Sequence, residues 1–364
     1  MKKKTLLLCL ISYLLCAPLT GCGTDTNPLP DGNTLPSSSA DTSSGIPDTT
    51  PADNSSPAPT DTAGISPSPS DSPDASPASE THEPTPTPEP ESGLRDNTPH
   101  CLVPTTGGTE ETHNEYASID YSNAAEGYIM ARYTGECPKV KMQIKGSNSV
   151  TYTYNLGSSE YEAFPLSSGS GAYEITILEN VFDTNYVICL TVTVEVTLSN
   201  EFGPYLYPNQ YCSFDSASHA VALAEELAAP ANTDLEVIAN VYNYVITSIS
   251  YDYDKAETVP SGYIPDVDAV LESGLGICLD YAAVMTSMLR SQRIPTRLEV
   301  GYAGDLYHAW ISAYIQDVGW VNGIVQFDGK DWELMDPTLA SMVEETELRD
   351  FISDESNYVV KYSY

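Results

Sequence analysis

Gly276-Ile277-Cys278-Leu279-Asp280-Tyr281-Ala282-Ala283 begins a run of residues with the apolar spacing of a helix, which we expect to continue to about Gln292. At the start of a helix the first backbone N–H groups have no partner inside the helix, and the helix dipole favours negative charge there. A cysteine in this position forms its thiolate more readily, and the thiolate is the nucleophile. The stretch therefore predicts that Cys278 is a nucleophile at the start of an α-helix.

Two residues further along the chain complete a candidate triad with Cys278. His308 lies in the Tyr-His-Ala-Trp stretch 307–310, and Asp336 lies in the Leu-Met-Asp-Pro-Thr stretch 334–338. A nucleophile, a base and an orienting acid in this order are the residues that covalent acyl chemistry needs. Taken singly, a helical cysteine is more often a small core residue, a strand histidine is more often buried in a core, and an Asp-Pro pair is more often a turn. Their joint occurrence favours the triad.

The chain between about residues 233 and 338 resembles the transglutaminase-like superfamily of cysteine hydrolases and acyltransferases. The resemblance rests on the Gly-x-Cys helix start, the Arg-x-x-x-Ile-Pro-x-Arg turn at 290–297, the His-Ala-Trp strand and the Trp…Asp-Pro-Thr strand end. It implies a C-terminal α+β domain of the papain/transglutaminase-like type with an antiparallel sheet. It also implies that Cys278 attacks a carboxamide or peptide carbonyl, that His308 transfers the proton and that Asp336 orients the histidine ring.

The thioester formed on Cys278 has two fates, and the sequence leaves both open. Attack by water gives a protease, amidase or deamidase, whereas attack by an amine gives a protein-glutamine acyltransferase; access of water to the cleft decides between them. The backbone N–H of Cys278 is one expected donor to the oxyanion, and the segment near Tyr251 is a candidate for the second. A hypothesis from another class is a non-catalytic binding or scaffold protein of the cell surface, which has no need of all three triad residues.

No cofactor or metal site is expected from the sequence. It contains neither Gly-x-Gly-x-x-Gly nor Gly-x-x-x-x-Gly-Lys-[Ser/Thr], and no Cys-x-x-Cys pair. The stretch 251–254 resembles a calcium loop but lacks the turn glycine and the distal glutamate. The net charge of −36 repels nucleic acid and anionic lipid. We therefore expect a protein or peptide substrate, with cell-wall components among the candidates, and no nucleic-acid partner.

The amino terminus has the pattern of a bacterial lipoprotein signal over residues 1–22. Three lysines precede an apolar run from Leu6 to Leu15, which is too short for a stable membrane span. The sequence Leu-Thr-Gly-Cys follows and resembles the lipoprotein cleavage box, so Cys22 is the expected lipidation site. The lipid would hold the protein outside the cytoplasm on the bacterial membrane, exposed at the cell surface. An ordinary signal peptide with a chance cysteine is the alternative.

Residues 23–100 are expected to form a disordered tether. They are mostly Ser, Thr, Pro, Asp and Ala, so they cannot bury enough apolar surface to offset the entropy of ordering. Such a segment would lift the folded part away from the membrane, although a linker with no required length explains it equally.

Residues 101–205 are expected to form an all-β sandwich of the immunoglobulin-like type. Segments with alternating apolar residues are separated by turns, which is typical of an antiparallel sandwich. The expected strands are 116–121, 128–133, 140–145, 150–156, 172–178 and 186–198. Nothing in this region has catalytic spacing, so a binding, positioning or spacer role is expected.

Four cysteines remain outside the signal and the triad: Cys101, Cys137, Cys189 and Cys212. An oxidising compartment permits disulfides among them, and four cysteines allow three pairings. The sequence does not choose among these pairings, and Cys189, inside an apolar strand, also fits a small buried residue.

Residues 206–364 are expected to form the catalytic domain, with helices packed against an antiparallel sheet. The pattern predicts a helix through 221–227, a second from 234 with Thr233 as its N-cap, and a short third at 265–271 that Gly274 ends. The expected strands are 296–302, 308–315, 320–327, 330–335 and 357–362, the last at a sheet edge.

Overall fold

The computed structural model describes residues 95–364, apart from residues 158, 317, 323, 328–331, 336–337 and 339–356. The chain divides into two compact units, and all described residues belong to the unit that contains Ser92–Tyr364. The expected signal with Cys22, and nearly all of the expected tether, lie outside the described residues. Within the described part, no helix is both long and apolar enough to cross a membrane.

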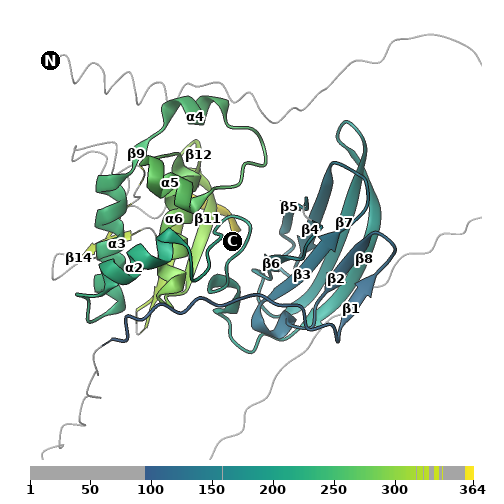
Figure 1. The fold of residues 1–364 in the computed structure, drawn as a ribbon, viewed down its shortest axis with the longest axis horizontal. Coiled ribbons are helices and arrows are strands. Elements are labelled where there is room, and N and C mark those ends of the chain that lie inside the picture. Colours follow the sequence, from purple (N-terminus) through teal and green to yellow (C-terminus); the bar gives the residue numbers. More distant parts are fainter. Residues whose placement is uncertain are drawn as a thin grey trace, which may run out of the picture. The chain divides into compact units, whose positions relative to one another are not determined.

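The N-terminal part of the described chain consists of two four-stranded antiparallel sheets (Figure 1). The first sheet has the order β1-β2-β3-β6 and the second the order β5-β4-β7-β8. The strands of the first are β1 (Glu111–His113), β2 (Ala117–Asp120), β3 (Tyr128–Tyr133) and β6 (Glu162–Pro165). The strands of the second are β4 (Val140–Lys145), β5 (Thr151–Asn155), β7 (Gly171–Phe182) and β8 (Asn185–Val196).

Alternating apolar residues place one face of the second sheet in the core. On β4, Met142 and Ile144 are buried, and they pair across the ladder with Ile177 and Ile175 of β7, which are buried as well. The strands β3 and β4 have the bounds predicted from sequence, whereas the short strands β1 and β6 were not predicted. The immunoglobulin-like classification of the two sheets stays a prediction.

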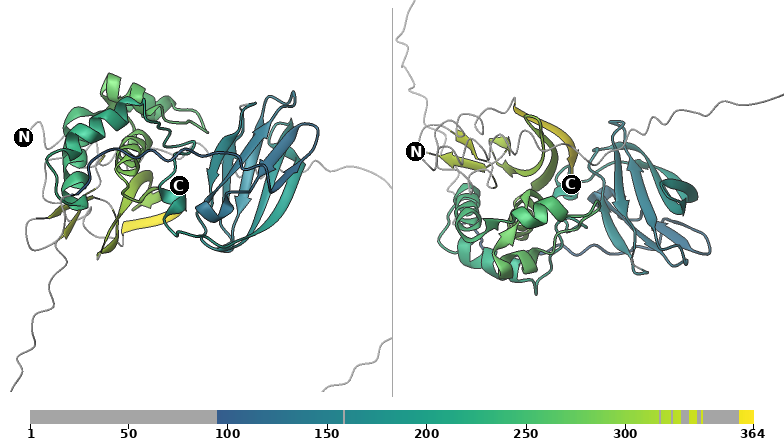
Figure 2. Two further views of the ribbon diagram at one scale, coloured as in Figure 1. Left: turned by 60° about the horizontal axis from the view of Figure 1, so that its bottom comes forward. Right: turned by 90° about the horizontal axis from the view of Figure 1, so that it is seen from above.

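The C-terminal part combines helices with antiparallel sheets, as the sequence predicted (Figure 2). Its main sheet has the order β13-β12-β11-β16. The strands are β11 (Thr296–Ala303), β12 (Leu306–Ile315), β13 (Gly319–Asn322) and β16 (Tyr358–Ser363). The helices are α2 (His219–Ala228), α3 (Asp234–Ser248), α4 (Tyr253–Thr258), α5 (Val267–Ser273) and α6 (Cys278–Ser291).

Smaller elements complete this part of the chain. A parallel pair joins β9 (Ser250–Tyr251) to β10 (Leu275–Gly276), and an antiparallel hairpin joins β14 (Ile324–Phe327) to β15 (Trp332–Met335). Two turns of 3-10 helix are η1 (Ala124–Glu126) and η2 (Gly203–Tyr205). The single strand expected at 320–327 is two strands in the structure, because β13 pairs with β12 whereas β14 pairs with β15.

Helix α6 forms the centre of the C-terminal core. Every residue from Asp280 to Ser291 is buried, and the helix packs against β11 and β12 on one side and against α2, α3 and α5 on the other. A helix enclosed on all sides needs small or apolar residues around its whole circumference. Ala282, Ala283, Ser287 and Met288 meet this need. The position of this helix is fixed by contacts along its length.

Arg290, near the end of α6, holds three separate segments of the chain together. Its guanidinium is buried and donates to the carbonyl oxygen of Thr296 from Nε at 3.0 Å and from Nη2 at 2.7 Å. It also donates to the carbonyl oxygens of Tyr207 at 2.6 Å and Tyr364 at 2.8 Å. Backbone carbonyls thus satisfy a buried cation, which would otherwise destabilise the fold. This arrangement explains why an arginine begins the Arg-x-x-x-Ile-Pro-x-Arg turn.

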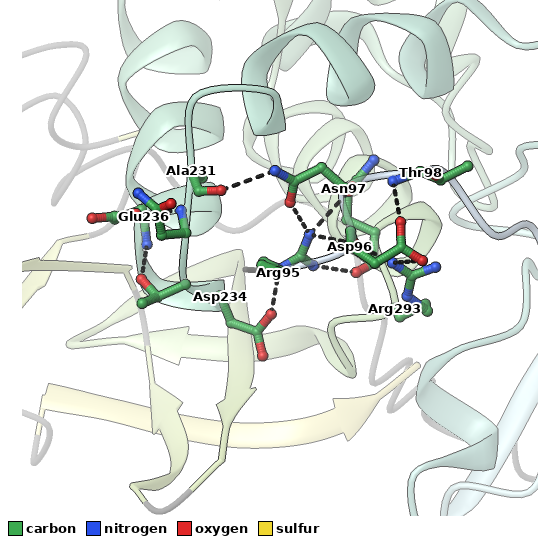
Figure 3. A network of polar contacts seen from close by, with 11 residues as sticks. Arg95, Asp96, Asn97, Thr98, Ala231, Asp234, Glu236 and Arg293 are labelled. Carbon is green, nitrogen blue, oxygen red and sulfur yellow. Dashed lines mark hydrogen bonds and ion pairs between the residues drawn. The ribbon is translucent and has the colours of Figure 1, made fainter. Parts of the chain in front are cut away.

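The first described residues, 95–100, form a strap across the C-terminal part of the chain (Figure 3). Arg95 Nε donates to the carboxylate of Asp234, at the start of α3, at 2.7 Å, and its Nη2 donates to the carbonyl oxygen of Gln292, just after α6, at 2.5 Å. Asn97 donates to the carbonyl oxygen of Ala231 at 2.9 Å. The last six residues of the expected tether are therefore hydrogen-bonded to the folded unit, and they precede β1 in the chain.

Candidate active site

Cys278 is the first residue of α6 and is partly exposed. Ile277 precedes it as the N-cap with an extended backbone, so the chain enters the helix at the cysteine itself. Because the first N–H groups of a helix have no acceptor inside the helix, Cys278 lies beside free donors and the positive end of the helix dipole. The structure thus places Cys278 at the expected helix start, while its catalytic role stays a prediction.

A buried carboxylate two residues later fixes this helix start. Asp280 is fully buried, and its Oδ2 accepts the backbone N–H of Ile277 at 2.8 Å. Lys255 Nζ donates to the same oxygen at 2.6 Å, and the hydroxyl of Tyr263 donates to Oδ1 at 2.7 Å. Burial opposes the charge of Lys255, but the hydrogen bonds to Asp280 and Tyr263 outweigh it and raise the pKa of the lysine. The aspartate, lysine and tyrosine form one network beside Cys278.

The network fastens the segment before α5 to the start of α6. Asp252 is the N-cap of α4, and its side chain accepts the backbone N–H of Lys255 at 2.9 Å. The stretch 251–254, which resembles a calcium loop in sequence, is therefore the end of β9 and the start of α4. In the described part of the chain, no three or more His, Cys, Asp or Glu side chains form a cluster that could hold a metal ion.

His308 is the third residue of β12, and its side chain is buried. It pairs with Gly301 of β11, and its ring lies 6.2 Å from that of Trp310 with the two planes 20° apart. The two rings share one face because alternate residues of a strand point the same way. Gly301 has no room for a side chain, since a Cβ there would lie 2.0 Å from the carbonyl oxygen of Val359. The strand β16 therefore approaches β11 closely at the level of the histidine.

Helix α6, which begins with Cys278, packs against β12, which contains His308. Burial raises the pKa of Tyr251, and the Cys278 thiol raises it further. Burial also raises the pKa of Tyr307, and Cys278 is again among the groups that add to the effect. Tyr307 directly precedes His308 on β12, so the two side chains point to opposite faces of the sheet. Two members of the predicted triad thus lie on two elements that pack against each other, α6 and β12.

Asp336, the third member of the predicted triad, lies outside the described residues. The strand β15 ends one residue earlier, at Met335, and pairs with β14 from Ile324↔Met335 to Phe327↔Trp332. The role of Asp336 as the residue that orients His308 stays a prediction.

A second buried carboxylate lies in the same sheet and was not predicted. Glu299 on β11 faces Trp310 across the ladder, and its Oε2 accepts the hydroxyl of Ser312 at 2.8 Å. Burial raises the pKa of Glu299, which the hydrogen bond from Ser312 and the charge of Arg297 partly oppose. The only sequence signal for this group is a single acidic residue inside the strand Thr296–Ala303. Asp280 had a clearer signal, because an acid two residues after a helix start is a common capping residue.

The cysteines of the described region are all free thiols: Cys101, Cys137, Cys189, Cys212 and Cys278. Cys212 is buried, and its sulfur lies 3.1 Å from Nη1 of Arg290. The other three cysteines outside the site are partly exposed, so Cys189 is not a fully buried core residue. In this structure none of the three pairings that the sequence allows is formed.

Residues 221–323 match the sequence profile of the transglutaminase-like superfamily. The matched segment runs from α2 to the end of β13 and contains both Cys278 and His308. This segment therefore belongs to the transglutaminase-like superfamily, as the sequence motifs implied. Among curated proteins, no sequence is similar enough to count as a relative.

Three solved structures are similar to parts of this one. A "Putative Cysteine Protease" from Cytophaga hutchinsonii is 16% identical with a TM-score of 0.31, over 63% of this chain and 69% of that chain. A "putative protease" from Parabacteroides distasonis is 17% identical with a TM-score of 0.25, over 50% of this chain and 36% of that one. The red sea bream transglutaminase is 14% identical with a TM-score of 0.25, over 58% of this chain and 48% of that chain. At these values the three structures carry no conclusion about activity.

Proposed function

We propose that this chain is a cysteine hydrolase or acyltransferase that acts on carboxamide or peptide bonds through a thioester on Cys278. The observation that carries the proposal is the position of Cys278, partly exposed, as the first residue of α6, which packs against β12, the strand that carries His308. A partly exposed thiol at the positive end of a helix dipole is suited to nucleophilic catalysis, and a histidine on the neighbouring strand is the proposed base. The membership of residues 221–323 in the transglutaminase-like superfamily supports the same chemistry.

The proposed reaction has two steps. His308 takes the thiol proton and the thiolate adds to the carbonyl carbon, while the oxyanion accepts hydrogen bonds from the backbone at the start of α6. The hydroxyl of Tyr251 is the proposed second donor, since burial raises its pKa and keeps it protonated. His308 then protonates the departing amine and the thioester remains. Water or a second amine attacks the thioester while His308 takes its proton. The carbon–sulfur bond then breaks, and the Cys278 sulfur leaves and recovers the proton from His308. Asp336 holds the histidine ring throughout.

The proposed location follows from the sequence pattern at the amino terminus. A lipid on Cys22 would hold the protein to the outer face of the bacterial membrane, and the residues up to the strap would act as a tether. The substrate would then be a protein or peptide at the cell surface, with cell-wall peptides among the candidates. The net charge of −36 favours basic or neutral partners over acidic ones.

A thiol-labelling experiment tests the nucleophile before any substrate is known. We expect a mild alkylating agent at neutral pH to label Cys278 first in the folded protein, and faster than in the denatured chain. The variant His308→Ala should lose this advantage, because the imidazole would no longer accept the thiol proton. The variant Cys101→Ala removes another partly exposed cysteine and should change nothing. Labelling of Cys278 no faster than in the denatured chain would favour the non-catalytic binding protein.

A second experiment separates hydrolysis from transamidation. The protein, kept reduced, is incubated with a glutamine-bearing protein with and without a labelled primary amine, and the products are followed by mass spectrometry. Amine incorporation that disappears in Cys278→Ala would establish an acyltransferase. Cleavage or deamidation that the amine does not affect would establish a hydrolase.

A further inference from the structure

A cavity of about 310 Å³ lies away from Cys278, and no part of the proposed reaction uses it. Its lining consists of Ser167, Gly169, Ser170, Leu198, Glu201, Pro204, Tyr205 and Arg297. Arg297 pairs with Ser312 on β12, four residues beyond His308. At about 3.3 Å per strand residue the cavity is roughly 13 Å along the sheet from the histidine. Its volume is at the lower end of the range for small-molecule sites.

Arg297 is held rigidly at the wall of this cavity. Its guanidinium carbon lies 3.7 Å from the ring centre of Trp320 and 4.8 Å from that of Tyr205. Contacts with two aromatic rings restrict the guanidinium, so a ligand would lose little of its binding energy to ordering this side chain. The hydroxyl of Tyr205 donates to the carbonyl oxygen of Ser167 at 3.1 Å, which in turn fixes one of the two rings.

One nitrogen of the same guanidinium lacks a hydrogen-bond partner. Its Nε is buried without a hydrogen-bond partner, and so is the hydroxyl oxygen of Ser167. Arg297 belongs to none of the ion pairs among the described residues. Glu299, two residues along the same strand, is influenced by the charge of Arg297 but forms no ion pair with it. A partly buried charge without an ion-pair partner is costly, so this group is suited to pairing with an anion from outside the chain.

The other charged group in the lining restricts what that anion can be. A guanidinium presents two parallel donors that match a carboxylate or a phosphate. Glu201 lines the same cavity and would repel a multiply charged anion such as phosphate. It would attract an ammonium group on the same ligand. A molecule with one carboxylate and one ammonium group therefore fits both charges.

We propose that this cavity is a binding site for the carboxylate and ammonium groups of a free amino acid or a short peptide. The carboxylate would accept hydrogen bonds from Arg297 and from Ser167 after a small shift of its hydroxyl, and the ammonium group would pair with Glu201. Pro204 and Leu198 would contact the apolar part of the ligand. The site is independent of the reaction proposed at Cys278 and is present whether or not that reaction occurs.

Calorimetric titration of the full chain with a series of probes tests which chemical groups of a ligand the site binds. The probes are alanylalanine, its C-terminal amide, its N-acetyl derivative, free alanine and inorganic phosphate. We expect alanylalanine to bind in the millimolar range or tighter, and the amide and the acetyl derivative to bind about tenfold more weakly. Free alanine binding as tightly as the dipeptide would identify an amino-acid site, and weaker alanine binding a peptide site. No alanylalanine binding at about 20 mM would overturn the proposal.

Two variants test which residues bind the carboxylate and the ammonium group of the ligand, and a third is the control. Arg297→Gln should weaken alanylalanine about tenfold and should not weaken the amide further. Glu201→Gln, at an exposed residue, should weaken alanylalanine but leave the N-acetyl derivative unchanged. Arg293→Gln, which removes an arginine outside the cavity, is the matched control and should leave binding intact. If Arg297→Gln fails to fold, the binding of alanylalanine to Glu201→Gln still tests the proposal. Equal binding of the dipeptide and its amide to the unchanged protein would contradict the proposal. Binding of phosphate that is tighter than that of alanylalanine would contradict it as well.

Discussion

Asp280 is the residue on which the geometry beside Cys278 depends most directly. Its carboxylate receives a backbone N–H, a lysine ammonium and a tyrosine hydroxyl, all at 2.8 Å or less. Its place in the first helical turn could be predicted from sequence, because an acid there caps the helix. Its partners could not, since Lys255 and Tyr263 come from segments that only the folded chain brings to α6. Capping patterns are local, whereas ion pairs depend on the tertiary fold.

Lys255→Met should lower the free energy of unfolding by about 2 kcal/mol, because it leaves the buried Asp280 with one charged donor fewer. The same change should slow the alkylation of Cys278, since the segment around α4 would be held less firmly against the helix start. Chemical denaturation measures the first effect and the labelling rate the second. Lys145→Met, at an exposed strand end, is the control and should change neither. Equal unfolding midpoints for the two variants would show that the network contributes no stability.

Because the carboxyl group of Glu299 is buried, we expect the stability of the folded protein to depend on pH. Burial raises its pKa, so the protonated form is favoured on folding. For such an acid the folded state loses stability as the pH rises from the unfolded pKa through the folded one. Glu299→Gln should therefore increase the free energy of unfolding at neutral pH and change it little in acid, because an amide can still accept the hydroxyl of Ser312. Denaturation at several pH values measures this; Glu195→Gln, on an exposed strand face, should show no such trend.

At the scale of elements, the sequence predicted those with strong periodicity. Helix α6 and strands β3, β4, β11 and β12 lie within about two residues of their expected bounds. Thr233 caps α3 as expected, and its hydroxyl accepts the backbone N–H of Glu236 at 3.2 Å. The carboxylate of Glu236 accepts the N–H of Asn232 and not that of Thr233, so only one of the two hydrogen bonds of a capping box is formed.

The elements that sequence reasoning missed are short or depend on pairing. β1 and β6 have three and four residues and α4 has six, too few for a periodic pattern to be recognised. The division of 320–327 into β13 and β14 is a change of pairing partner, and alternation alone says nothing about partners. In the candidate site, Cys278 and His308 could be placed because each lies at the end of a periodic element.

The strap is an element whose stability can be measured. Arg95→Ala should lower the free energy of unfolding by about 1–3 kcal/mol, because its guanidinium is mostly buried against Asp234 and Gln292. The neighbouring pair of Arg293 and Asp96 is more exposed, so Asp96→Ala should cost less than about 0.5 kcal/mol. Thermal unfolding of the two variants gives the comparison. A cost for Asp96→Ala equal to that for Arg95→Ala would show that burial of the pair does not matter.

For the whole molecule, the expected division into tether, β part and catalytic part requires one change of detail. Composition predicted disorder up to residue 100, but 95–100 pack on α3 and on the end of α6. Composition is an average over many residues, so it cannot predict that one arginine will form an ion pair with a residue far away in the sequence. The strap also means that the folded unit begins with residues that belong spatially to its C-terminal part.

Arg290 donates hydrogen bonds to three backbone carbonyl groups, and we expect these bonds to make the folding of this unit cooperative. They come from the connector at Tyr207, from Thr296 directly before β11 and from Tyr364 beyond β16. A chain in which α6 has packed but β16 has not yet docked would carry a buried cation with too few acceptors, and such a species is unfavourable. Partly assembled states are therefore poorly populated, and the connector, the central helix and the final strand should form and be lost in a single cooperative transition.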